Sequence, residues 1–186
     1  MTKGIFCIEG AWVNDLRDVS TVKPILELLQ KGEGVPYIHH DSLCKEELFF
    51  LLAKWAQKRY KDYPILYLAM HGTTHGLVPY MWNTVPLNEI AEKLKGKCTN
   101  RIILMGSCLI FKSSIKILSS FKNETDALAI CGYQTSVGWT ESTAFELLLM
   151  STLQKYKFNK YSLRFIEEKL TTLADRFPDL KFRIIT

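Results

Sequence analysis

Hydrophobic residues in this chain gather in short continuous runs, and the segments between the runs repeat with the spacing of amphipathic helices. An apolar run of about four to eight residues between turn residues is typical of a strand that is buried on both faces. We expect six such strands, at residues 3–9, 35–41, 64–71, 101–108, 127–137 and 181–186.

Helices are predicted between these runs, at residues 21–31, 42–61, 87–94, 111–121, 140–155 and 160–175. Three of them are expected to begin at hydroxyl side chains, which accept a hydrogen bond from the first free N–H groups: Ser20 or Thr21, Ser42 and Thr140. Residues 76–87 contain two prolines and predict a small hairpin or extended lip, because proline is excluded from central strands.

Strands that alternate with helices predict an α/β fold with a mostly parallel sheet covered on both faces, which is a three-layer α/β/α arrangement. We expect the first four strands in the spatial order 2-1-3-4, with the fifth strand beyond the fourth. The 186 residues suit one domain, 1–186, and the chain shows no repeat or linker.

The composition excludes several classes of protein. The net charge is +5, but the densest basic group, Lys54, Lys58, Arg59 and Lys61, fits the solvated face of a helix, so we expect no nucleic-acid partner. No apolar run approaches the ~18 residues of a membrane span, and no signal peptide is evident. Five cysteines without a C-x-x-C pair indicate reduced thiols and a cytoplasmic protein. Gly-rich phosphate loops do not occur, so we expect no cofactor.

Reactive side chains close two of the predicted strands: His71-Gly72 follows one, and Ser107-Cys108 follows the next. Parallel neighbouring strands bring their carboxyl ends to the same rim of a sheet, where open α/β sheets bind ligands. A thiol beside an imidazole is a nucleophile beside its base. Glycine at position 72 lets the backbone approach closely, so the N–H groups of Gly72 and Cys108 could stabilise an oxyanion.

A buried strand ending in His-Gly, then a hairpin and a short helix, then a buried strand ending in Ser-Cys, resembles the caspase-like cysteine peptidases, most closely their CHAT and metacaspase branch. The resemblance covers residues 3–153. It implies a catalytic dyad of His71 and Cys108, an oxyanion hole that includes the Gly72 N–H, and a peptide or protein substrate. The family commonly has glycine or a polar residue after the cysteine, where this chain has Leu109, so a catalytically degenerate binding or regulatory module stays an alternative.

The same resemblance places the pocket for the residue before the cut near the end of the first strand and after the strand that follows the cysteine. These places offer the acidic and aromatic side chains Glu9, Trp12, Asp15, Trp139 and Glu141. An acidic pocket favours lysine or arginine in the substrate through charge complementarity. Together with Trp82, the tryptophans Trp12 and Trp139 are expected to form the wall of a peptide groove.

Histidines and a carboxylate at strand ends suggest a rival chemistry. His39-His40-Asp41 and the pair His71/His75 could converge on one rim and hold a divalent metal. The pair His71/His75 lies on a predicted loop, however, and so lacks the fixed geometry that a helix gives to such a spacing. We therefore assign no metal ligand, and a metal-dependent hydrolase or a non-catalytic α/β binding module stay as alternatives.

Overall fold

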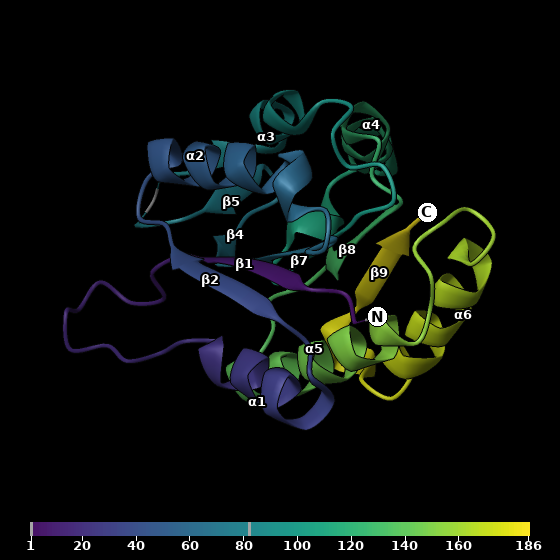
Figure 1. Ribbon diagram of the computed structural model, residues 1–186. Coiled ribbons are helices and arrows are strands. Elements are labelled where there is room, and N and C mark those ends of the chain that lie inside the picture. The colour runs from purple at the N-terminus through teal and green to yellow at the C-terminus, as the bar shows by residue number, and fades with distance from the viewer. Residues whose placement is uncertain (1, 82) are drawn as a thin grey trace.

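The computed structural model describes residues 2–81 and 83–186, and a six-stranded sheet lies at its centre (Figure 1). In spatial order its strands are β2 (Tyr37–Asp41), β1 (Ile5–Glu9), β3 (Ile65–Ala69), β7 (Ile102–Met105), β8 (Ala129–Tyr133) and β9 (Phe182–Ile185). The first five strands are parallel, and β9 pairs antiparallel with β8 at the edge. The predicted α/β class and strand order are confirmed.

Helices cover both faces of this sheet, which makes three layers (Figure 1). One face carries α2 (Lys45–Trp55), α3 (Leu87–Leu94) and α4 (Ile115–Thr125), and the other carries α1 (Lys23–Glu33), α5 (Trp139–Gln154) and α6 (Leu163–Ala174). Short 3-10 turns occur at Lys58–Tyr60, Ile110–Lys112 and Pro178–Leu180. Within the described ranges, none of the helices is both long and apolar enough to cross a membrane.

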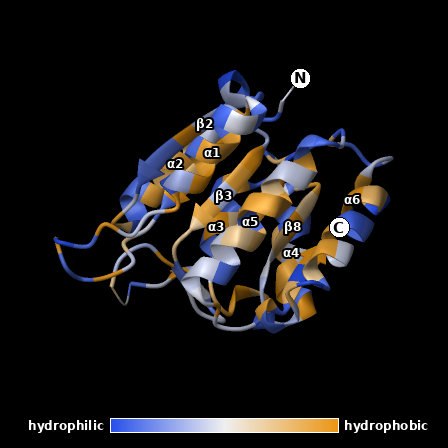
Figure 2. Ribbon diagram, turned by 90° about the horizontal axis from the view of Figure 1, so that it is seen from below, coloured by the Kyte–Doolittle hydropathy of each residue, from blue (hydrophilic) through white to orange (hydrophobic). Residues whose placement is uncertain are grey.

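Alternation of side chains along each strand builds the two cores. In β3, Leu66 and Leu68 pack beneath α2 and α3, whereas Ile65 and Tyr67 pack against the layer of α1 and α5. All four side chains are fully buried. Figure 2 shows hydrophobic residues in the central strands, whereas the helices carry both hydrophobic and hydrophilic residues. Each such side chain contributes about 1.5–3 kcal/mol through burial.

A second, antiparallel sheet lies beside the carboxyl ends of the main strands. It consists of β4 (His71–Gly72), β5 (Gly76–Val78) and β6 (Val85–Pro86), and it confirms the predicted hairpin. The predicted third strand was too long, because the main sheet ends at Ala69 and the chain then turns into β4. The predicted fourth strand was also too long, because β7 ends at Met105. In both cases the apolar run extends past the last hydrogen bond between the strands, because the turn that follows is also largely buried.

The predicted hydroxyl caps are wrong. The N-cap residues are Val22 for α1, Cys44 for α2 and Gly138 for α5. Thr21 Oγ1, one residue before the cap position, accepts from the Lys23 N–H at 3.1 Å and donates to the Glu9 carboxylate, and Ser42 Oγ donates to the Cys44 carbonyl. At the start of α2, it is the Cys44 Sγ that accepts a hydrogen bond from the Glu47 N–H.

Several element limits also differ from prediction. The helix expected at 42–61 ends at Trp55, and the helix expected at 111–121 begins at Ile115 after a 3-10 turn. The fifth strand ends at Tyr133, four residues earlier than expected. The terminal strand is confirmed as β9.

Candidate active site

His71 and Cys108 line one cavity of about 130 Å³ at the carboxyl ends of β3 and β7. These strands are direct neighbours in the sheet and run parallel, so no other strand separates the two residues. Trp12, Trp139 and Glu146 contribute to the same cavity. The sequence-based expectation that one rim would hold both the imidazole and the thiol agrees with this placement.

A backbone carbonyl holds the imidazole of His71. Nε2 donates to the Trp12 carbonyl over 2.7 Å, and the indole of Trp12 packs edge-on against the ring at 5.4 Å between centroids. Because a carbonyl can only accept, this hydrogen bond requires the proton on Nε2. The neutral ring then keeps its lone pair on Nδ1, which is the atom that could take a proton.

Cys108 occupies a tight turn directly after the main sheet. Its Sγ accepts a hydrogen bond from the Val137 N–H at 3.4 Å. The next residue, Leu109, adopts a left-handed backbone with φ of 64° and donates its N–H to Thr135 at 3.1 Å. Residues other than glycine rarely adopt this backbone conformation, so the surrounding contacts must hold the turn in place.

Three of the other cysteines are buried in the two cores. Burial raises the pKa of Cys98 to about 12 and raises the pKa of Cys7 and Cys131 as well. Thiols of this kind stay protonated at neutral pH and react slowly. The half-exposed thiols of Cys108 and Cys44 are therefore the ones that reagents and substrates can reach.

Gly72 lies directly against the backbone of Cys108. A Cβ at position 72 would stand 2.6 Å from the Cys108 carbonyl oxygen and 2.9 Å from the Ser107 Cβ, closer than side chains tolerate. This confirms the close approach predicted for the glycine. Among the residues that the structure describes, none accepts a hydrogen bond from the Cys108 N–H, so that group is available to an oxyanion.

Glu146 of α5 is a buried carboxyl in the same cavity, and it is not among the residues predicted from the sequence. Tyr133 donates its hydroxyl to Oε1 at 3.0 Å, and Tyr67 donates to Oε2. Burial raises the pKa of Glu146 to about 7, although the two tyrosine hydrogen bonds act in the opposite direction. Gly106 leaves room for this group, since a Cβ there would stand 2.8 Å from Oε1.

A signal for Glu146 does exist in the sequence. It is the only charged residue between Glu141 and Lys155, and it lies three and four positions before Leu149 and Met150. Those spacings put it on the buried face of the helix. A lone carboxyl on such a face needs partners of its own, which is the mark of a functional or structural polar cluster.

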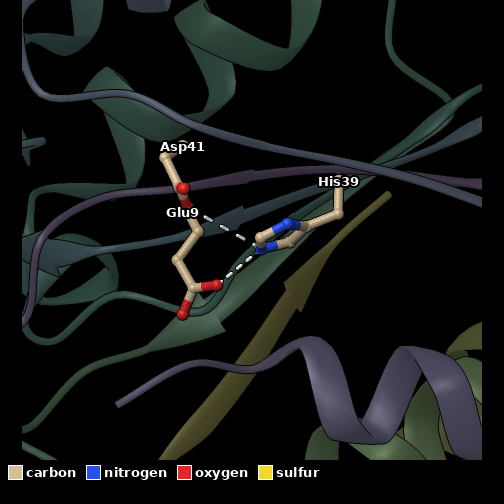
Figure 3. Close-up of side chains that lie close together, drawn as sticks. All are labelled: Glu9, His39 and Asp41. Atoms are coloured by element: carbon tan, nitrogen blue, oxygen red, sulfur yellow. Dashed lines mark hydrogen bonds and ion pairs between the residues drawn. The ribbon is translucent and has the colours of Figure 1, made fainter. Parts of the chain in front are cut away.

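Glu9 closes a polar clamp at the end of β1 (Figure 3). Its Oε1 accepts from Trp12 Nε1 at 2.6 Å and from the Val22 N–H at 2.8 Å. Its Oε2 accepts from Thr21 Oγ1 at 2.7 Å and lies 2.6 Å from His39 Nε2. Burial alone would raise the pKa of Glu9, but these four hydrogen bonds together lower it. The clamp holds Trp12, whose carbonyl in turn holds His71.

The carboxylate of Glu9 also belongs to the group of side chains that could bind a metal ion. Within the described part of the chain, one group has metal-ligand spacing: Glu9, His39 and Asp41, whose ligand atoms lie within 4.8 Å of one another (Figure 3). The Glu9 carboxylate already accepts four hydrogen bonds, and a cation would have to displace some of them. His71 and His75 do not join this group, because His71 contacts Trp12 and His75 contacts Thr74.

We expect the substitution Glu9→Gln to lower the free energy of unfolding by about 2–4 kcal/mol. The NH2 group of the glutamine would face two of the donors that now bind a carboxylate oxygen, so their hydrogen bonds would be lost. Hydrogen bonds to a buried charged group are worth about 1.5–3 kcal/mol each. Urea unfolding at pH 7 measures the change. Asp15→Asn is the matched control, since Asp15 is solvent-exposed and its carboxylate pairs with Arg17 in the same loop. Equal unfolding midpoints for the two variants would contradict the clamp.

Only some of the other predicted site residues lie at the cavity that contains Cys108. Trp139 lines the Cys108 cavity and packs edge-on against Trp12 at 4.8 Å. Asp15 lines a separate, open cavity beside Glu9. Glu141 is exposed on the first turn of α5 and does not line the Cys108 cavity. Trp82 lies outside the described residues.

Comparison with known proteins adds one finding. A search of curated proteins gave no significant match. The sequence does match a family profile over residues 2–183, which is nearly the whole chain, and the profile is described as a family of unknown function. The chain therefore belongs to the family DUF6642.

Proposed function

We propose that this protein is a cysteine endopeptidase of the caspase-like type, with Cys108 as nucleophile and His71 as base. The observation that carries the proposal is the shared cavity of these two residues, which follow the carboxyl ends of the neighbouring parallel strands β3 and β7. The hydrogen bond from His71 to the Trp12 carbonyl supports it, since it fixes the tautomer that a base requires.

The reaction follows from these roles. The Cys108 thiol gives its proton to Nδ1 of His71, and Sγ attacks the peptide carbonyl carbon. The N–H groups of Cys108 and Gly72 stabilise the resulting oxyanion. The C–N bond then breaks, the imidazolium gives its proton to the leaving amine, and a thioester stays on Cys108. Water, deprotonated by His71, hydrolyses the thioester and restores the thiol.

Specificity for lysine or arginine before the cut is part of the proposal. The Glu146 carboxyl lines the cavity that contains Cys108, so a cationic side chain bound there would pair with a negative charge in a site shielded from water. Such a cation would also favour the ionised form of Glu146. Glu146 thereby takes the part that was predicted for the acidic side chains of Glu9, Asp15 and Glu141.

The free state of all five cysteines supports a reducing compartment, and we propose the cytoplasm.

Peptide acyloxymethyl ketones that end in arginine, lysine or aspartate provide the test, because they alkylate only an activated thiol that binds the peptide. We expect the arginine and lysine probes to label Cys108 at least about tenfold faster than the aspartate probe. Mass spectrometry of tryptic peptides identifies the labelled residue, and the half-exposed Cys44 is the internal control. The substitution His71→Ala should slow labelling of Cys108 and leave Cys44 unaffected. Equal labelling of the two thiols by every probe would refute the proposal and favour a non-catalytic binding module.

A further inference from the structure

A second cavity, of about 530 Å³, lies beside the Cys108 cavity and shares Trp12 and His71 with it. Its lining includes His71 and Gly72 but not Cys108. The remaining walls are mainly apolar, and their largest side chains are Trp12, Val13, Val78, Tyr80 and Met81. No charged residue contributes to this lining within the described ranges.

Two chain segments are joined to form this cavity. The loop after β1 is tied to the loop after β5 by a hydrogen bond from the Ala11 N–H to the Pro79 carbonyl at 2.8 Å. A second link runs from the Tyr80 hydroxyl to Asn14 Oδ1 at 2.7 Å. Gly10 permits the contact, since a Cβ there would stand 2.6 Å from the Pro79 oxygen. The cavity therefore exists before any ligand binds, as ligand pockets usually do.

Apolar side chains at the rim of this cavity are open to solvent. Val13 is 55% exposed and Met81 is 43% exposed. Exposed apolar side chains around a concave apolar surface are typical of a site that a ligand covers.

We propose that this cavity binds an apolar side chain, aromatic or large aliphatic, of the residue immediately after the scissile bond. The inference rests on the proposed peptidase function. During cleavage the acyl part of the substrate stays on Cys108, whereas the leaving amine takes its proton from His71. The leaving residue must therefore lie next to His71, whereas the acyl part lies at Cys108. A cavity that is lined by His71 but not by Cys108 fits the leaving residue.

Size and polarity decide the chemical class of the bound side chain. A volume of about 530 Å³ accommodates an aromatic ring, and the apolar walls disfavour a charged group that would lose its hydration there. We expect a peptide with phenylalanine or leucine after the cut to have kcat/KM at least about tenfold higher than the peptide with glycine, and aspartate to be poorer still.

The experiment compares internally quenched peptides that have lysine before the cut and phenylalanine, glycine or aspartate after it. In the variant Met81→Asp, kcat/KM for the phenylalanine peptide should fall at least about tenfold, and that for the glycine peptide should change little. Deacylation should stay at the wild-type rate, because the leaving residue has departed by then. Leu16→Asp is the matched control, since Leu16 is fully exposed in the loop after β1 and does not line this cavity.

The outcomes separate this inference from the proposed function. Cleavage at equal rates for all three peptides, or equal effects of Met81→Asp and Leu16→Asp, overturns the apolar subsite and leaves the peptidase proposal standing. Absence of cleavage, together with absence of Cys108 labelling by the acyloxymethyl ketones, overturns both.

Discussion

Replacing Cys108 with alanine is expected to lower the rate of peptide hydrolysis at least about 10³-fold, because no thioester can form without Sγ. The fold should survive the change. The side chain is half-exposed, and its Sγ accepts a single hydrogen bond from Val137, so we expect the free energy of unfolding to change by less than about 1 kcal/mol. Hydrolysis of a lysine-containing quenched peptide and urea unfolding measure the two quantities on the same preparation.

Cys44→Ser is the matched control for this prediction. Cys44 is also half-exposed, but it caps α2, and serine is a better cap for a helix. The variant should keep the wild-type rate of hydrolysis. A protein with alanine at position 108 that still cleaves peptides at the wild-type rate would remove Cys108 from the mechanism.

As the pH rises from about 4.5 to about 7, the free energy of unfolding of the wild-type protein is expected to decrease by about 3 kcal/mol. The substitution Glu146→Gln should abolish this decrease. The pKa of Glu146 is about 7 in the folded state against 4.5 for an unperturbed glutamate. Between these values the unfolded chain releases a proton that the folded protein retains, so the free energy of unfolding decreases as pH rises. Below pH 4.5 both states are protonated, and above pH 7 both are ionised, so the effect is confined to this window.

Urea unfolding at half-unit steps between pH 4 and pH 8 (about nine curves per variant) measures this difference. Glu141→Gln is the control, since Glu141 lies on the same helix but is exposed. Its pH profile should match that of the wild type. Parallel profiles for the wild type and Glu146→Gln would show that the carboxyl does not titrate in this range.

The same variant tests the role of Glu146 in specificity. Glutamine keeps the size of the side chain and can still accept from a tyrosine, but it carries no negative charge. We therefore expect the preference for lysine or arginine over uncharged residues before the cut to decrease at neutral pH.

Much of the fold could be predicted because buried strands are written as uninterrupted apolar runs. The run that ends at Ala69 and the run that ends at Met105 identified two central parallel strands, and the prolines at 79 and 86 identified the hairpin between them. Chain order and right-handed crossovers then gave the spatial order of the first five strands of the main sheet, but not the place of the terminal strand.

The limits of the elements could not be predicted, because they depend on tertiary contacts. Thr21 has the side chain of a helix cap, yet Val22 takes the cap position, and the Thr21 hydroxyl donates to the buried carboxylate of Glu9. His71 continues an apolar run, yet it leaves the main sheet because β5 offers it a second partner. The local sequence does not show which of two possible partners each residue will take.

The candidate site was predictable only in part for the same reason. Position at a strand end identified His71 and Cys108. Glu146 lies almost forty residues after Cys108, and only the packing of α5 beneath the sheet brings it to the same cavity. Its partners Tyr67 and Tyr133 come from two further strands.

The proposed base lies in the small antiparallel sheet and the proposed nucleophile in the turn after the main sheet, and the two segments touch at Gly72. Their spacing is set by a residue that has no side chain, because the Cys108 carbonyl occupies the place that a methyl group would fill. One methyl group at this position would act as a wedge between thiol and imidazole while most of both cores stayed unchanged. Inactive relatives of this protein could therefore arise by a single substitution far smaller than the loss of either reactive group, and position 72 is where a survey of such relatives should begin.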